Sequence, residues 1–318
     1  MKSIESPQGK EVSTKYYFSK LFYGFLRNFR SINTQQAYKK DLKDFFLYLQ
    51  RKGVGLPEVD HHEMVRYMNH LREFKESRKP HRFEESTINR KLSCLSKFFK
   101  YLININEVKF DKNPCHFLER HRQPLAIKTK IMPQETFYKL LEKDYGCDEK
   151  GLLYTSIMRL LLTTAMRQGE LRSLKRKDLK VIGSEFFLEY TSKGKKFRKI
   201  KIHPKAIGPL KAYLEKTNNI TDPESPLFFR TKKGRGKSQT SPISSAGIVK
   251  IFKSCLRLAG IDPIYTPHSA RATAVTVLYS NGADIKDLKD FLGHESINMS
   301  DAYVKSSSDR IEKVASLF

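Results

Sequence analysis

Hydrophobic residues recur at helical spacing along the first third of the chain and predict an all-helical unit there. The first helix is expected over 33–50, begins at Ser31 or Asn33, and ends at Gly53 and Gly55. A second is expected at about 61–74, and a third follows a capping Ser86 and reaches about 103. The apolar face of this third helix consists of Ile88, Leu92, Leu95, Phe99 and Leu102. Asn113-Pro114 then ends the unit.

The rest of the chain has a mixed pattern, in which helices surround one hairpin. Segments 185–191 and 198–203 have the composition of strands, and the turn SKGKKF separates them. In the second segment Lys199 and Lys201 alternate with Ile200 and Ile202. Helices are expected at 133–143, 151–166, 203–217, 246–258, 267–280 and 284–292. The pattern therefore predicts a mainly α protein with a small antiparallel β-sheet in its C-terminal domain.

Length and charge suggest two domains and a polyanionic partner. The chain has 318 residues, and 60 Lys and Arg against 34 Asp and Glu give a formal net charge of +26. Basic residues occur in both halves rather than in one tail, so nucleic acid is the expected partner. The alternatives are a solvated basic surface or binding to a membrane surface.

Cysteine usage and hydropathy narrow the protein class further. Cys94, Cys115, Cys147 and Cys255 are scattered, which argues against a zinc site or a disulfide framework and indicates a reducing compartment. No signal peptide is apparent at the N-terminus. No apolar run approaches the ~18 residues of a membrane-spanning helix. A cytoplasmic protein with no membrane partner is expected.

The stretch from Thr266 to Lys305 carries candidate chemistry. His268 and Arg271 lie three positions apart and share one face of the expected helix. His294 follows the end of the next helix, and Tyr303 lies in a short helix after it. Cationic groups, a ring N–H donor and a phenol suit an anion that is attacked by an oxygen nucleophile. The alternative is a pair of amphipathic helices with surface His and Arg and a packed Tyr.

A basic helix face in the first unit is a second candidate. Its members share the side of the expected helix opposite the apolar stripe and are Arg90, Lys91, Lys97 and Lys100. They could contact phosphates along a groove of DNA, or they could simply solvate the helix.

The order Arg, Lys, His-x-x-Arg, His, Tyr resembles the tyrosine recombinase (phage-type integrase) family, which shares its chemistry with type IB topoisomerases. TTAMRQGELRSL resembles the family's arginine corner, with Arg167 and its supporting Glu170. SKGKKFRKIKI resembles the hairpin that carries the family's lysine, at Lys193. PHSAR matches His-x-x-Arg, and LGH supplies His294, nine residues before Tyr303.

The resemblance implies a role for each of these residues. Arg167 and Arg271 would hold the non-bridging oxygens of a DNA phosphate, and His294 would add a hydrogen bond. Tyr303 would be the nucleophile that forms a 3′-phosphotyrosine linkage, with His268 as general base and Lys193 as general acid. No metal and no other cofactor is expected, since the cationic side chains supply the positive charge and no acidic cluster is evident.

The resemblance spans nearly the whole chain and implies a helical core-binding domain followed by a mixed α/β catalytic domain. The expected parts are a flexible N-terminus at 1–12, the core-binding domain at 13–115, a linker at 116–130, the catalytic domain at 131–308 and a tail at 309–318. The implied partner is double-stranded DNA with inverted-repeat core sites, bound by a homotetramer when synapsed. The tail would dock on a neighbouring subunit or on its own domain, accessory DNA-bending proteins could assist, and the implied location is the bacterial nucleoid.

Two departures from the family pattern bear on the biological role. Ala272 follows Arg271 where many relatives have a second His, and Ala165 stands where Gly is common. They favour an integrase of a mobile element over an Xer-type dimer resolvase. Three competing functions are a non-catalytic DNA-binding protein on the same scaffold, a relaxing topoisomerase and an RNA-binding module.

Overall fold

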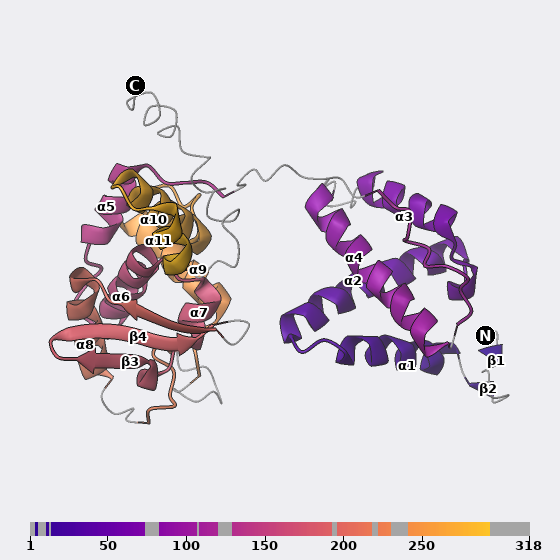
Figure 1. Cartoon of the computed structure of the whole chain (residues 1–318), viewed down its shortest axis with the longest axis horizontal. Helices are drawn as coiled ribbons and strands as arrows, with labels where there is room; N and C mark the ends of the chain where they lie inside the picture. The colour runs from indigo at the N-terminus through magenta and orange to yellow at the C-terminus, as the bar shows by residue number, and fades with distance from the viewer. Residues whose placement is uncertain are drawn as a thin grey trace, which may run out of the picture. The chain divides into compact units, whose positions relative to one another are not determined.

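The computed structural model describes residues 4–5, 11–12, 14–73, 83–106, 108–119, 129–192, 196–217, 222–229 and 241–292. The chain divides into two compact units, residues 1–124 and 125–318, each with its own hydrophobic core (Figure 1). The predicted fold class is confirmed. The expected bounds of the linker, 116–130, and of the tail, 309–318, stay predictions.

The first unit is a helical bundle. Its helices are α1 (Thr14–Arg27), α2 (Ile32–Lys52), α3 (His61–Glu73) and α4 (Glu85–Ile105). Aromatic rings join them: Phe25 of α1 packs edge-to-face on Phe98 of α4, and Phe45 of α2 does so on Tyr67 of α3. Buried aromatic pairs of this kind fix the helices against one another.

The helix ends follow from local chemistry, with one correction. Ser31 accepts a hydrogen bond from the Thr34 N–H, and Gly53 ends α2 in the left-handed conformation with φ of 68°. The predicted cap at Ser86 is wrong, because α4 begins at Glu85 and its N-cap Glu84 makes no side-chain cap bond.

Two parts of the N-terminal region were not predicted. The aromatic run after residue 13 forms α1, which buries Leu21, Phe25 and Leu26. Within the segment expected to be flexible, β1 (Ile4–Glu5) pairs antiparallel with β2 (Glu11–Val12). The run in α1 mixes aromatic and basic residues, and β1 and β2 are two residues long, so periodicity indicates none of these elements.

The expectation that Lys91 lies on the solvated face of its helix is wrong. Its side chain is only 2% exposed, and its Nζ lies 2.5 Å from Asp44 and 3.4 Å from Asp41. The Asp41 carboxylate is fully buried, and it also accepts a hydrogen bond from Arg90. Burial raises the pKa of Asp41, while Lys91 and then Arg90 oppose that rise. This ion cluster joins α2 to α4, so Lys91 is unsuited to phosphate contact.

Lys91→Met is expected to destabilise the first unit by about 3 kcal/mol, because it leaves the buried Asp41 carboxylate without its buried partner. Urea unfolding followed by circular dichroism measures the change. Lys100→Met is the matched control: Lys100 is an exposed lysine of the same helix, and its loss should cost under about 0.5 kcal/mol. Equal midpoints for the two variants would contradict a structural role for Lys91.

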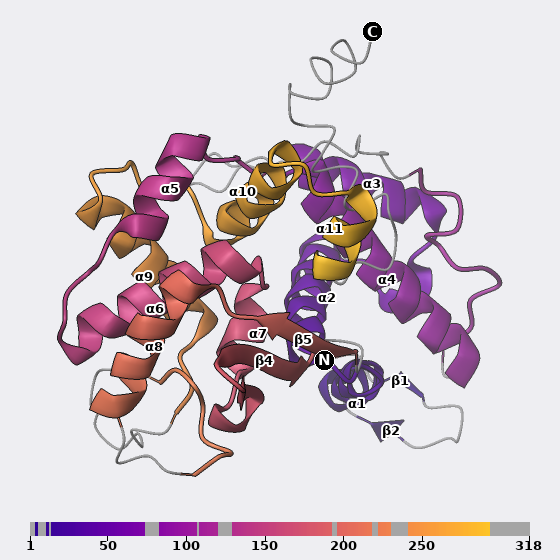
Figure 2. The same ribbon diagram turned by 60° about the vertical axis from the view of Figure 1, so that its left-hand side comes forward.

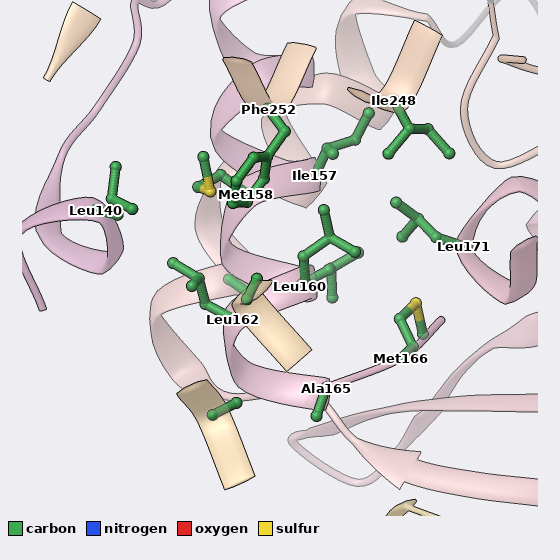
Figure 3. Packing of buried hydrophobic residues seen from close by; sticks show 14 of the residues in the cluster. Leu140, Ile157, Met158, Leu160, Leu162, Ala165, Met166, Leu171, Ile248 and Phe252 are labelled. Carbon is green, nitrogen blue, oxygen red and sulfur yellow. The ribbon is translucent and has the colours of Figure 1, made fainter. Parts of the chain in front are cut away.

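The second unit is built around α6 (Glu149–Thr164). This helix contacts α5 (Gln134–Glu142), α8 (Pro204–Lys216), α9 (Ser245–Leu258) and α10 (Pro267–Ser280). Its side chains are buried nearly all round, as the near-continuous apolar sequence predicts. Figure 3 shows Leu140 of α5 and Ile248 and Phe252 of α9 packed around Ile157, Met158 and Leu160. The remaining helices are α7 (Gln168–Ser173) and α11 (Ile285–Leu292).

Arg159 of α6 makes several polar contacts inside this core. Its guanidinium donates to the carbonyl oxygens of Leu141 at 3.0 Å, Glu142 at 3.3 Å and Lys205 at 2.8 Å. The first two carbonyls belong to the last two residues of α5, and the third belongs to the first turn of α8. The Leu141 and Glu142 carbonyls lie at the C-terminal end of α5 and lack intrahelical partners, and the Lys205 carbonyl lacks one because Pro209 has no N–H, so Arg159 ties both helices to α6.

The sheet has three antiparallel strands in the order β3-β4-β5, which are Leu179–Ile182, Glu185–Thr191 and Phe197–Lys201. Figure 1 labels β3 and β4, and Figure 2 labels β4 and β5. The predicted hairpin is confirmed as β4 and β5. Strand β3 was missed, because its short sequence LKVI has no alternation of polar and apolar residues. The Ser192 N–H donates to Lys196 O at 2.8 Å, which continues the ladder beyond the pair of Thr191 and Phe197.

No helix within these described ranges is both long enough and apolar enough to cross a membrane.

Candidate active site

Arg167 lies in the corner predicted from the sequence. Helix α6 ends at Thr164, and Ala165 adopts the left-handed region with φ of 48° before Arg167 caps α7. This conformation favours glycine, because the Cβ of alanine crowds the backbone there. The departure from the family pattern at Ala165 therefore falls on the residue that reverses the chain.

Glu170 holds the corner from inside. Its carboxylate accepts the Arg167 backbone N–H at 2.8 Å and the Arg167 Nη1 at 3.1 Å. Glu170 is only 7% exposed, whereas the Arg167 side chain is 44% exposed. The carboxylate thus fixes one edge of the guanidinium and leaves much of the group accessible to a ligand.

Glu170→Gln is expected to slow the DNA cleavage that the sequence resemblance implies by about 10- to 100-fold, because a loosened Arg167 would no longer meet a phosphate at the required geometry. Single-turnover cleavage of a nicked duplex measures the effect. Glu224→Gln is the control, since Glu224 pairs with Lys175 and Lys177 at an exposed position. Cleavage by Glu170→Gln at the wild-type rate would contradict a supporting role.

His268 and Arg271 lie in the first turns of α10, whose N-terminus is fixed by a capping box. Thr266 and Ser269 form a reciprocal capping box, and Pro267 occupies the first turn. His268 lies near the helix start with its side chain partly exposed and partly buried, and Arg271 lies one turn later and is 3% exposed.

Arg271 connects distant parts of the unit. Its Nη1 donates to the Ala165 carbonyl oxygen, and its Nη2 donates to the Leu292 carbonyl oxygen at 3.1 Å. Ala165 is two residues before Arg167, and Leu292 is two residues before His294. The guanidinium of Arg271 is therefore fixed beside the Arg167 corner.

Electrostatics join His268 to the same group of residues. Partial burial lowers the pKa of His268, and the positive charges of Arg271 and then Arg167 lower it further. The three side chains thus lie close enough to influence one another, and a neutral imidazole is favoured at pH 7.

Two residues that the sequence analysis missed border this group. Tyr190 of β4 is buried, and its hydroxyl has no hydrogen-bond partner among the described residues. Burial raises the pKa of Tyr190 to about 12, with Glu170 adding to the rise and Arg198, Arg271 and Arg167 opposing it. Arg198 pairs with Tyr190 across the ladder and donates to the Phe291 carbonyl oxygen. The sequence did offer one sign of Arg198: it lies two residues before Ile200 on β5, so this cation shares the apolar face of the strand.

Lys193, His294 and Tyr303 lie outside the described residues, so their roles stay predictions. On the first unit, Arg90 is exposed but bound to Asp41, and Lys100 is exposed. Lys97 is hydrogen-bonded to the Tyr38 hydroxyl at 3.2 Å and lies over the Phe29 ring. Across the part of the chain that the structure describes, no cluster of His, Cys, Asp and Glu is arranged to hold a metal ion.

Comparisons with known proteins identify tyrosine recombinases as relatives of this chain. The XerD tyrosine recombinase of Listeria monocytogenes serotype 4b (strain F2365) is 28% identical over 91% of this chain and 93% of its own length. The XerC tyrosine recombinase of Syntrophus aciditrophicus (strain SB) is 27% identical over 89% of this chain and 90% of its own length.

Solved structures share the fold. XerH recombinase bound to palindromic difH substrate matches with a TM-score of 0.70 and 20% identity over 89% of this chain and 79% of that one. The Tn1549 transposon integrase in complex with transposon right end DNA matches with a TM-score of 0.64 and 18% identity over 93% of this chain and 98% of that one.

Family models cover both units. Residues 20–106 match the N-terminal SAM-like domain of phage integrases, and residues 131–310 match the phage integrase family. The second match alone spans more than half of the chain and includes Arg167, Glu170, His268 and Arg271. The chain therefore belongs to the phage integrase family.

Proposed function

We propose that this tyrosine recombinase cleaves and rejoins double-stranded DNA at specific inverted-repeat sites through a 3′-phosphotyrosine intermediate. The observation that carries the proposal is the hydrogen bond from Arg271 to Ala165, which brings two guanidinium groups from distant segments to one corner. Paired guanidinium groups suit the non-bridging oxygens of a phosphate, because each offers a planar fork of donors.

The reaction is a transesterification with balanced bonds. The Tyr303 oxygen attacks the scissile phosphorus, and the bond from phosphorus to the 5′ oxygen breaks. The phenol proton passes to neutral His268, and Lys193 donates a proton to the leaving oxygen. Arg167, Arg271 and His294 stabilise the charge that builds on the phosphate. Rejoining reverses these steps and needs no ATP, because one phosphoester replaces another.

Covalent capture tests the proposal. Lightly nicked genomic fragments are incubated with the full-length protein, denatured in detergent, and recovered through protein that remains attached. A nick beside the cut lets the short product strand leave, so the covalent state accumulates. Recovery of one inverted-repeat sequence, with the phosphate attached to the Tyr303 peptide by mass spectrometry, is the expected result. No covalent recovery would support a non-catalytic DNA binder, and recovery without sequence preference would support a relaxing topoisomerase.

The biological role follows from the captured site. We favour an integrase of a mobile element, with Ala272 as the distinguishing departure, so the site should lie at the ends of an element. The alternative is Xer-type dimer resolution, which the names of the XerC and XerD relatives support; it requires one chromosomal site instead. Action on DNA locates the protein in the bacterial cytoplasm with the nucleoid. A tetramer would synapse two sites, with residues 309–318 docking between subunits and accessory bending proteins assisting.

The cleavage rate is expected to fall only at a pH below 6.5, the ordinary imidazole value, because the pKa of His268 is lowered. Neutral His268 accepts the proton, so activity persists above its pKa and is lost as the imidazole becomes protonated. Single-turnover cleavage rates between pH 5 and pH 8 measure this loss at low pH, and the loss should be absent in His268→Ala. A midpoint at or above 6.5 would contradict the assignment.

A further inference from the structure

The carboxyl end of α11 receives two guanidinium groups from outside the helix. Arg198 of β5 donates to the Phe291 carbonyl oxygen, and Arg271 of α10 donates to the Leu292 carbonyl oxygen at 3.1 Å. The last carbonyls of a helix have no partners within it, and they carry the negative end of its dipole. Two cations at this end therefore fix the position of the last turn.

Arg198 differs from its neighbours on the strand. Lys199 and Lys201 point to the outer face of the sheet, where they pair with Glu189 and Glu185. Arg198 lies on the opposite face, directly across from buried Tyr190. A cation that faces inward carries a desolvation cost, so its contact with α11 is a feature of the fold rather than of the solvated surface.

The contact of Arg198 reaches Arg271 through the backbone of α11. Arg271 is oriented by two carbonyl oxygens, one at the end of α6 and one at the end of α11. Helix α6 is buried on nearly all sides, and Ala165 at its end is itself buried. Helix α11 is short, and among its residues only Leu288 and Leu292 are buried. The orientation of Leu292 thus depends on contacts that hold the last turn of α11.

We propose that Arg198 is a positioning residue for DNA cleavage: by binding Phe291 it holds the last turn of α11, so that Leu292 keeps the guanidinium of Arg271 directed at the scissile phosphate. The proposal rests on the function proposed above. Arg198 need not touch DNA, since its effect passes through one turn of helix.

The charges around Tyr190 support this arrangement. Arg198, Arg271 and Arg167 all act on the pKa of its phenol, and Glu170 acts in the opposite direction. The inward face of the hairpin and the arginine corner therefore lie in one neighbourhood.

A neutral phosphate analogue tests the proposal. A methylphosphonate at the scissile position carries no negative charge, so cleavage there does not need a correctly placed guanidinium to neutralise it. Arg198→Met and Arg198→Gln are compared with wild type on nicked duplexes of the captured site, with either phosphate or methylphosphonate. Lys201→Met is the matched control, since it removes a cation from the outer face of the same strand.

Arg198→Met is expected to cleave the phosphate about 10- to 100-fold more slowly, to bind DNA within about threefold of wild type, and to lose most of its defect on methylphosphonate. Arg198→Gln keeps a donor for Phe291 and should recover part of the rate. Lys201→Met should cleave like wild type. A defect of equal size on both substrates, or none on phosphate, would overturn the positioning role.

Arg271→Ala separates this inference from the proposed function. A strong defect of Arg271→Ala that methylphosphonate relieves, together with an unrelieved defect of Arg198→Met, rejects the inference alone. Wild-type cleavage by Arg271→Ala rejects the phosphate-binding role of Arg271 and the inference with it, whereas an absence of covalent capture by the wild-type protein rejects the proposed function.

Discussion

Tyr303→Phe is expected to bind the captured DNA site with wild-type affinity and to form no covalent adduct on a nicked duplex. The substitution removes only the phenolic oxygen, so the contacts that bind DNA remain while the nucleophile is lost. Gel shifts measure binding, and denaturing electrophoresis measures the adduct.

A phenylalanine substitution at another tyrosine controls for this change. Tyr279→Phe removes a hydroxyl from α10 and should leave adduct formation unchanged. An adduct in Tyr303→Phe would show that another residue attacks the phosphate, and the proposed chemistry would then be wrong.

Arg271→Ala is expected to slow cleavage by about 10³-fold, the scale seen when one donor to a developing anion is removed. Arg271→Lys retains the charge but cannot serve both carbonyl oxygens and a phosphate together, so we expect a loss of about 10²-fold. Single-turnover rates on the nicked duplex measure both effects.

Thermal unfolding must accompany these rates, because Arg271 also ties Ala165 to Leu292. The rates are compared at a temperature where both variants are folded. Arg257→Ala, at an exposed position in the last turn of α9, is the control and should cleave normally. Cleavage by folded Arg271→Ala within about tenfold of wild type would contradict the phosphate-binding role, since that role calls for a loss about a hundred times greater.

Much of the fold could be predicted because long helices have a strong periodic signal. Helix α6 was expected from its apolar run, and the hairpin of β4 and β5 from alternation around a lysine-rich turn. Strand β3 is short and largely exposed, so nothing in its own sequence distinguishes it from a loop; it exists because β4 offers a free edge. Burial of Lys91 depends on Asp41 of another helix, which spacing within one helix cannot reveal.

The candidate site divides in a similar way. Arg167, Glu170, His268 and Arg271 could be chosen from spacing and resemblance, because each lies in a short motif. Arg198 and Tyr190 could not, since their importance comes from contacts with α11 and the arginine corner that are far away in sequence. Side-chain partners between distant segments are set by tertiary packing, which periodicity does not encode.

The link from Ala165 through Arg271 to Leu292 has a consequence for synthesis on the ribosome. Chains emerge N-terminus first, and domains fold as units once they are available. The helical first unit can therefore fold while residues near Leu292 are still untranslated. Arg271, which we propose binds the phosphate, gains its carbonyl contact with Leu292 only when α11 has left the exit tunnel. Nascent or truncated chains that lack α11 would therefore lack this contact even where their first unit is already folded.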